Sequence, residues 1–335
     1  MKSIKPAALL ALLVLTAPFA GAQWLTYNLP PLSSPFGVGT MGHLSDGRYL
    51  YAATGQAWIQ DAWASASFTE LAAGSYYFDP SFVAVANDSL AYIGSGGWGA
   101  TDILSLNPST PASPDSAPYG PPVQNYRAVV YDATSLYIGG GFGSGTNMFS
   151  SPNHAIGLFD GTTNRIVIDN ISAFSAGFDR DAAGNLYVAS SDDNTVYFFT
   201  AAQLASALDD GPLDLNDGVP LFTFQTTSSV AVDGLGRIWA SGYLTTGIEV
   251  YDPNLDLSSI FTPGASNENY LVLSFERDGV AYVGWLNNAD WDTDADMVYG
   301  YAEASALVVP EPSSVALLAL GVGTLAMVLR ARRKG

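Results

Sequence analysis

Short apolar runs separated by polar turns follow one another along most of the chain, and one arrangement of them recurs. In each copy an apolar run leads into a turn with Asp or Asn and usually Gly. Leu or Ile, an aromatic residue and a small residue come next. A turn that supplies positive φ between two apolar runs is typical of a β-hairpin. Six copies are found, and their aromatic positions are Tyr51, Tyr92, Tyr137, Tyr187, Trp239 and Tyr282.

The spacing of the copies indicates how the hairpins are assembled. Successive aromatic positions are 41, 45, 50, 52 and 43 residues apart, which is the length of a propeller blade. A further pair of apolar runs follows most copies, so each repeat can supply the four strands of a blade. The sequence therefore predicts an all-β fold, a β-propeller of about six blades. An array of β-sandwiches is the competing fold.

Other segments have defined places in this prediction. Residues 24–29 can pair with the last blade and close the ring, which removes an open edge strand. Residues 107–122, rich in Pro, Ser and Ala, are expected to form an exposed loop, and residues 201–208 a short helix. The expected organisation is a signal peptide over residues 1–22, a propeller over 23–308 and a sorting anchor over 309–335.

The best-preserved copies carry a recognisable motif. Residues 181–187 and 233–239 both follow the pattern Asp-x-x-Gly-x-Leu/Ile-Tyr/Trp. This pattern resembles the repeats of NHL-type and gluconolactonase-like propellers. For the gluconolactonase-like members, the resemblance implies a divalent metal held by carboxylates and Asn in the channel. The repeats do not align to individual ligands, so we assign no such residue here.

The first 22 residues have the three parts of a secretory signal. Lys2 and Lys5 form a positive start, and residues 7–17 supply an apolar stretch too short to span a membrane. Ala20 and Ala22 provide the small-x-small pattern that signal peptidase cleaves. The sequence predicts export with the body beginning at residue 23; an uncleaved anchor is the alternative.

The C-terminal end also has three parts. Pro310, Glu311 and Pro312 come first, followed by the uncharged residues 313–329. This run is long enough for a short transmembrane helix. The basic tail that follows favours the cytoplasmic side and consists of Arg330, Arg332, Arg333 and Lys334.

Together these parts resemble the PEP-CTERM sorting signal of Gram-negative bacteria that make exopolysaccharide. The resemblance implies an exosortase as a partner, cleavage near the Pro-Glu-Pro sequence, and an inner-membrane-anchored precursor. The mature protein would then reach the cell surface or extracellular matrix. An ordinary C-terminal anchor is the alternative.

The charge of the body limits its partners. Between signal and anchor the chain has 30 Asp and Glu against six Arg and no Lys, a net charge of −24. Such a body repels nucleic acid, because nucleic-acid binding depends on Lys and Arg that neutralise phosphate. Cations, basic partners and neutral glycans remain compatible. The absence of Cys excludes disulfides and thiolate chemistry.

The residues available for catalysis are few. His43 and His154 are the only histidines, so a Ser-His-Asp arrangement would need one of them. His43 lies beside an expected strand, and His154 is expected on a loop. We therefore expect a non-catalytic surface protein that binds exopolysaccharide or a protein partner. A propeller hydrolase or lyase acting on a lactone or glycan is the alternative.

One acidic cluster is a candidate for calcium. Alternating carboxylates present hard oxygen ligands at successive positions, as calcium loops do. The match is incomplete, because Ala295 stands where such a loop has Gly and Tyr301 where it has a bidentate Glu. A solvated hairpin loop gives the same alternation. The candidate ligands are Asp290, Asp292, Asp294 and Asp296.

Overall fold

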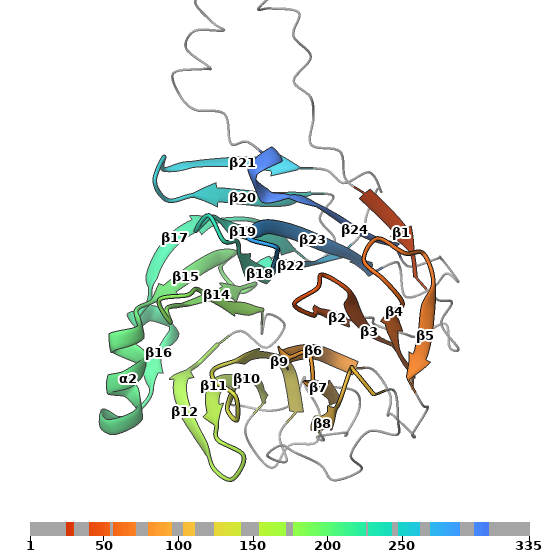
Figure 1. Cartoon of the computed structure of the whole chain (residues 1–335). Coiled ribbons are helices and arrows are strands. Elements are labelled where there is room, and N and C mark those ends of the chain that lie inside the picture. The colour runs from red at the N-terminus through yellow and green to blue at the C-terminus, as the bar shows by residue number, and fades with distance from the viewer. Residues whose placement is uncertain are drawn as a thin grey trace, which may run out of the picture.

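The computed structural model shows six β-sheets arranged around a common centre, which is a six-bladed β-propeller (Figure 1). The prediction of an all-β propeller with about six blades is confirmed. The structure describes residues 25–29, 40–53, 56–71, 80–95, 103–110, 124–141, 154–171, 177–225, 227–242, 247–261, 269–288 and 298–307.

Blades 1 to 3 contain strands β2 to β12, with β2, β6 and β9 innermost. Blade 1 comprises β2 (Thr40–His43), β3 (Tyr49–Ala53), β4 (Gln56–Gln60) and β5 (Phe68–Leu71). Blade 2 comprises β6 (Pro80–Asn87), β7 (Leu90–Ser95) and β8 (Ile103–Leu106). Blade 3 comprises β9 (Gln124–Val130), β10 (Leu136–Gly141), β11 (His154–Phe159) and β12 (Asn164–Asp169).

Blades 4 to 6 complete the ring, with β13, β18 and β22 innermost. Blade 4 comprises β13 (Phe178–Arg180), β14 (Leu186–Ser190), β15 (Thr195–Phe199) and β17 (Val219–Thr223). Blade 5 comprises β18 (Thr227–Val232), β19 (Ile238–Gly242), β20 (Ile248–Asp252) and β21 (Leu257–Phe261). Blade 6 comprises β22 (Asn269–Arg277), β23 (Val280–Asn288), β24 (Val298–Glu303) and β1 (Leu25–Asn28).

The repeat motif forms the turn between the first two strands of a blade. In blade 5 the Asp233 carboxylate accepts the backbone N–H of Arg237 at 3.0 Å and the indole N–H of Trp239 at 2.8 Å. In blade 4 Asp181 is bonded in the same way to Asn185 and to the Tyr187 hydroxyl. The motif Asp therefore closes the hairpin and also orients the aromatic ring six residues later.

The repeated aromatic residues lie on the second strand of every blade, where they pack between neighbouring sheets. This position explains why the motif recurs, because face-to-face sheets need large side chains between them. Tyr282 is partly buried, and the other five are buried: Tyr51, Tyr92, Tyr137, Tyr187 and Trp239.

The N-terminal strand closes the ring. β1 pairs antiparallel with β24, placing Leu25 opposite Tyr301 and Thr26 opposite Gly300 (Figure 1). Leu29, which follows β1, is buried in the cluster that joins blades 6 and 1. The prediction that residues near the N-terminus complete the last blade is confirmed.

An insertion in blade 4 extends the sheet of blade 3. Helix α2 (Ala201–Asp210) is capped at its N-terminus by Thr200, whose hydroxyl accepts the N–H of Gln203 in a capping box. β16 (Leu213–Asp214) then pairs in parallel with β12, and Asn170 donates to Asp214 at 2.6 Å. The short 3-10 helix η1 (Leu215–Asp217) follows. The expected helix is confirmed, and β16 covers the outer edge of β12.

The ends of the chain lie outside the described residues. They hold the predicted signal with Ala20 and Ala22, the predicted transmembrane helix over residues 313–329, and the basic tail. Over the described ranges, which end at Leu307 after η2 (Ala304–Ala306), we find no helix long and apolar enough to cross a membrane.

Candidate functional site

The turns between the first two strands of neighbouring blades lie at the same end of the ring, because the turns of blades 1 and 2, 3 and 4, and 6 and 1 contact each other. Every turn carries an aspartate, in chain order Asp46, Asp88, Asp132, Asp181, Asp233 and Asp278. Asp46, Asp132, Asp181 and Asp233 accept hydrogen bonds within their own turns. Asp88 differs, because its carboxylate bonds to the neighbouring blade.

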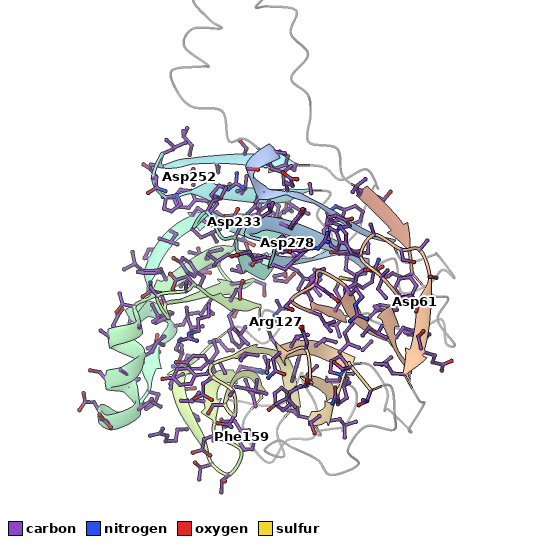
Figure 2. All side chains as sticks on the ribbon, viewed as in Figure 1. Asp61, Arg127, Phe159, Asp233, Asp252 and Asp278 are labelled. Atoms are coloured by element: carbon purple, nitrogen blue, oxygen red, sulfur yellow. The ribbon has the colours of Figure 1, made fainter. Side chains whose placement is uncertain are left out.

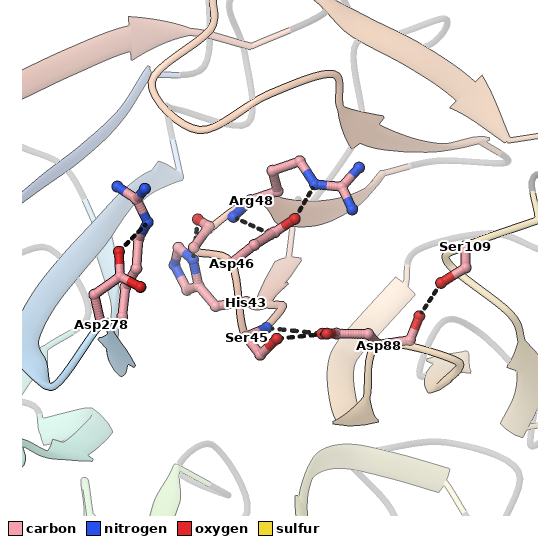
Figure 3. Close-up of polar contacts among 9 residues, drawn as sticks. His43, Ser45, Asp46, Arg48, Asp88, Ser109 and Asp278 are labelled. Carbon is pink, nitrogen blue, oxygen red and sulfur yellow. Dashed lines mark hydrogen bonds and ion pairs between the residues drawn. The ribbon is translucent and has the colours of Figure 1, made fainter.

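Asp88 joins the turns of blades 1 and 2 (Figure 3). Its carboxylate accepts the backbone N–H of Ser45 at 2.8 Å and also the Ser45 hydroxyl. The Ser109 hydroxyl donates to the backbone carbonyl of Asp88 at 2.6 Å. The hydrogen bonds from the Ser45 hydroxyl and N–H hold the pKa of the Asp88 carboxyl below its usual range, so it is ionised at neutral pH.

A pocket of about 310 Å³ lies next to this joint. Arg48 uses its Nε for an ion pair with Asp46 at 2.6 Å. Asp61 accepts the Thr69 hydroxyl at 2.7 Å, and this bond lowers the pKa of its carboxyl. The pocket is therefore surrounded by one cationic side chain, one carboxylate, two hydroxyls and two apolar side chains. Its lining residues are Arg48, Ile59, Asp61, Thr69, Pro108 and Ser109.

An aromatic surface where blades 1 and 6 meet is formed by Trp63 with Phe275, Tyr282 and Tyr301. Trp63 follows Asp61 by two residues on the connection between β4 and β5. The Arg277 guanidinium lies 4.7 Å from the centre of the Trp63 ring. Gly47 has φ +85° and lies under both side chains, where a Cβ atom would come within 2.6 Å of each. Only glycine fits at this position. The turn that carries Arg48 therefore also leaves the space that the Trp63 ring occupies.

His43 lies behind this surface in a defined neutral state. Its Nδ1 is 3.3 Å from the Gly47 carbonyl, which only accepts, so Nδ1 carries the proton. Nε2 then accepts from the Tyr299 hydroxyl at 2.9 Å. The ring stacks on Phe275 with centroids 3.6 Å apart. Burial lowers the pKa of His43 from 6.5 to about 3.

We expect the stability of the protein to fall as the pH decreases from 7 to 5. The folded pKa of His43 is below its unfolded value, so the stabilisation is complete above pH 6.5 and is lost as the unfolded chain takes up a proton. His43 can lower the free energy of unfolding by at most about 1.4 kcal/mol per pH unit. Its partial exposure reduces this value. Urea unfolding of the wild type and of His43→Gln between pH 7 and 5 measures the effect. The same pH dependence of the free energy of unfolding in both proteins would contradict the prediction.

The structure corrects one sequence expectation and leaves others as predictions. His154 was expected on a loop, but it is the first residue of β11 and is buried, because Gly141 of β10 pairs opposite it. The candidate calcium ligands Asp290, Asp292, Asp294 and Asp296 lie outside the described residues, as do Pro310, Glu311 and Pro312. In the described ranges we find no group of three His, Asp or Glu side chains placed to hold a metal.

Sequence comparison defines the C-terminal end. Residues 308–334 match the PEP-CTERM protein-sorting motif. The chain carries a PEP-CTERM sorting signal. This signal implies export, processing by an exosortase and a membrane-anchored precursor. No curated protein matches the chain in sequence.

Solved structures resemble the propeller at low sequence identity. Virginiamycin B lyase from Staphylococcus aureus, solved with quinupristin, is 10% identical with a TM-score of 0.56, covering 84% of this chain and 99% of the lyase. The PQQ-bound aldose sugar dehydrogenase from Streptomyces coelicolor is 12% identical with a TM-score of 0.55, covering 84% and 99%. A putative gluconolactonase is 15% identical with a TM-score of 0.54, covering 85% and 93%. At these identities the likeness shows the fold alone.

Proposed function

We propose that this exported propeller is a saccharide-binding protein of the cell surface or extracellular matrix. In this proposal it holds a neutral segment of exopolysaccharide in the pocket between blades 1 and 2. The observation that supports the proposal is the composition of the pocket: Arg48, Asp61, Thr69 and Ser109 place charged and hydroxyl groups around one hollow. After export, a signal peptidase and an exosortase would act on the two ends of the chain.

The chemistry of the pocket suits a sugar better than an apolar ligand. Sugar hydroxyls both donate and accept, so they need donors and acceptors side by side. The terminal nitrogens of Arg48 can donate, since only its Nε is used in the ion pair with Asp46. The ionised Asp61 carboxylate has lone pairs beyond the one used by Thr69. Ile59 and Pro108 supply apolar surface for the C–H face of a ring.

The size and charge of the site narrow the ligand further. A hollow of about 310 Å³ is at the small end of ligand pockets, which favours one or two sugar units over a folded protein surface. The net charge of −24 on the body opposes an acidic polymer. A neutral polysaccharide therefore fits better than a polyanion, and a protein partner remains the competing outcome of the experiment.

Binding of exopolysaccharide from the native host to the full-length protein in detergent tests the proposal. The double variant Arg48→Ala with Asp61→Asn should bind at least about tenfold more weakly, because charged hydrogen-bond partners contribute about 1.5–3 kcal/mol each. Arg165→Ala is the matched control, since Arg165 is exposed on β12 of blade 3. Equal binding by the double variant and the wild type, or binding only to a host surface protein, would reject the saccharide site.

A further inference from the structure

A second charged group lies at the middle of the ring, away from the pocket. Arg127 belongs to β9, the innermost strand of blade 3, and Figure 2 shows it toward the centre of the propeller. It is 8% exposed, whereas the neighbouring residues of this strand, Ala128, Val129 and Val130, contribute to apolar clusters. A positive charge therefore stands next to the apolar half of this strand, near the ring centre.

Among the described residues, the guanidinium of Arg127 is less fully paired than that of Arg237, another buried arginine. Its Nε is buried without a hydrogen bond. In the part of the chain that the structure describes, we also find no ion pair between Arg127 and any carboxylate. By contrast, Arg237 bonds to Asp233 through its Nε, whereas Arg180, whose Nε is also unpaired, donates to the Tyr131 carbonyl from a terminal nitrogen. A buried N–H without a hydrogen-bond partner is costly, because it gives up water without replacement.

Asp179 is the nearest source of compensating charge, but it is committed elsewhere. It lies on β13, the innermost strand of blade 4. Its two oxygens accept the backbone N–H groups of Val232 and Arg180, both at 2.8 Å. The charges of Asp179 and Arg127 influence each other without direct contact. Asp179 therefore reduces the cost of the buried charge but does not pair with the Nε of Arg127.

We propose that Arg127 binds a small molecule carrying a single carboxylate at the centre of the ring. The planar guanidinium offers two parallel N–H donors that match the two oxygens of a carboxylate. One positive charge balances one negative charge. A dianion or an acidic polymer is disfavoured, because Asp179 lies nearby and the whole body carries a net charge of −24. This site is independent of the saccharide pocket between blades 1 and 2.

Thermal denaturation of the full-length protein in detergent, at constant ionic strength, tests the proposal. The probes are acetate and lactate, their neutral counterparts acetamide and lactamide, and inorganic phosphate. A carboxylate at about five times its dissociation constant should raise the Tm of the wild type by about 2–4 °C. The amides, which have the same shape without the charge, should leave the Tm unchanged.

Variants at Arg127 locate the effect. Arg127→Met should abolish the rise, and Arg127→Lys should weaken carboxylate binding at least about tenfold, because it keeps the charge but loses the planar pair of donors. The lysine variant also serves if the methionine variant does not fold. Arg165→Met, at an exposed arginine of the same blade, should behave as the wild type. No rise with either carboxylate, an equal rise with the amides or phosphate, or a full rise in Arg127→Lys would overturn the proposal.

Discussion

Replacing Arg237 with alanine should lower the free energy of unfolding by about 3–5 kcal/mol. Arg237 is buried in the turn of blade 5, and its Nε donates to Asp233 at 2.8 Å. Its two terminal nitrogens donate to the carbonyls of Leu307 and Ala304, which belong to the end of blade 6. Removal of the guanidinium would leave the Asp233 carboxylate, which is 3% exposed, without its counter-charge.

The same arginine bonds to residues that directly precede the sorting motif. Leu307 and Ala304 are both buried in the cluster that joins blades 5 and 6. The matched sorting motif starts at residue 308, directly after Leu307. The bonds from Arg237 therefore hold the last described residues of the body against blade 5. Loss of these bonds is expected to affect the C-terminal end of the propeller first.

Chemical denaturation of Arg237→Ala, Arg237→Lys and Arg165→Ala measures the effect. The lysine variant keeps the charge but cannot reach Asp233 and two carbonyls together, so its stability should fall between the wild type and the alanine variant. Arg165→Ala removes an exposed arginine and should stay within about 0.5 kcal/mol of the wild type. A loss below about 1 kcal/mol for Arg237→Ala would show that the buried ion pair contributes little.

The fold was predictable because its signal is local. An Asp, usually a Gly, and an aromatic residue within seven positions mark each hairpin, and the hydrogen bonds of Asp181 and Asp233 show why the Asp and the aromatic residue occur together. Counting such hairpins gave the number of blades. The parallel pairing of β16 with β12 was not predicted, since it joins residues more than 40 positions apart and no repeat marks it.

The candidate sites were not predictable in the same way. The pocket combines Arg48 and Asp61 of blade 1 with Ser109 after blade 2, and only the packing of two blades brings them together. Arg127 left only a weak signal: it is the one charged residue of β9, but Gln124 and Asn125 make this strand partly polar. That signal does not distinguish an arginine paired with a neighbour from one without a partner. The difference depends on where Asp179 is held, which is a property of the assembled ring.

Deletion of residues 24–29 is expected to abolish the stable, cooperatively folded state. Without β1, the β24 strand loses its partner from Val298 to Tyr301 and becomes an open edge. The loss also removes Leu29, which is 6% exposed, from the cluster that joins the first and last blades.

The effect should exceed that of any single surface change, because the ring closes through this strand. Tyr299 and Tyr301 lie on β24 and are buried in the same cluster, next to Tyr49 of blade 1. Exposing them would weaken the contact between blades 6 and 1, and each of these blades also supports its other neighbour. We therefore expect loss of structure across the ring together with aggregation through the free edge of β24.

Calorimetry and size-exclusion chromatography of the deletion variant give the measurement. Leu25→Ala is the control, since Leu25 is 45% exposed and its side chain contributes little to the core; its Tm should stay close to that of the wild type. The deletion variant should elute as aggregates and show no cooperative transition. A monomeric deletion variant with the Tm of the wild type would mean that the ring is held closed by the packing of blades 6 and 1 alone, without the pairing of β1 and β24.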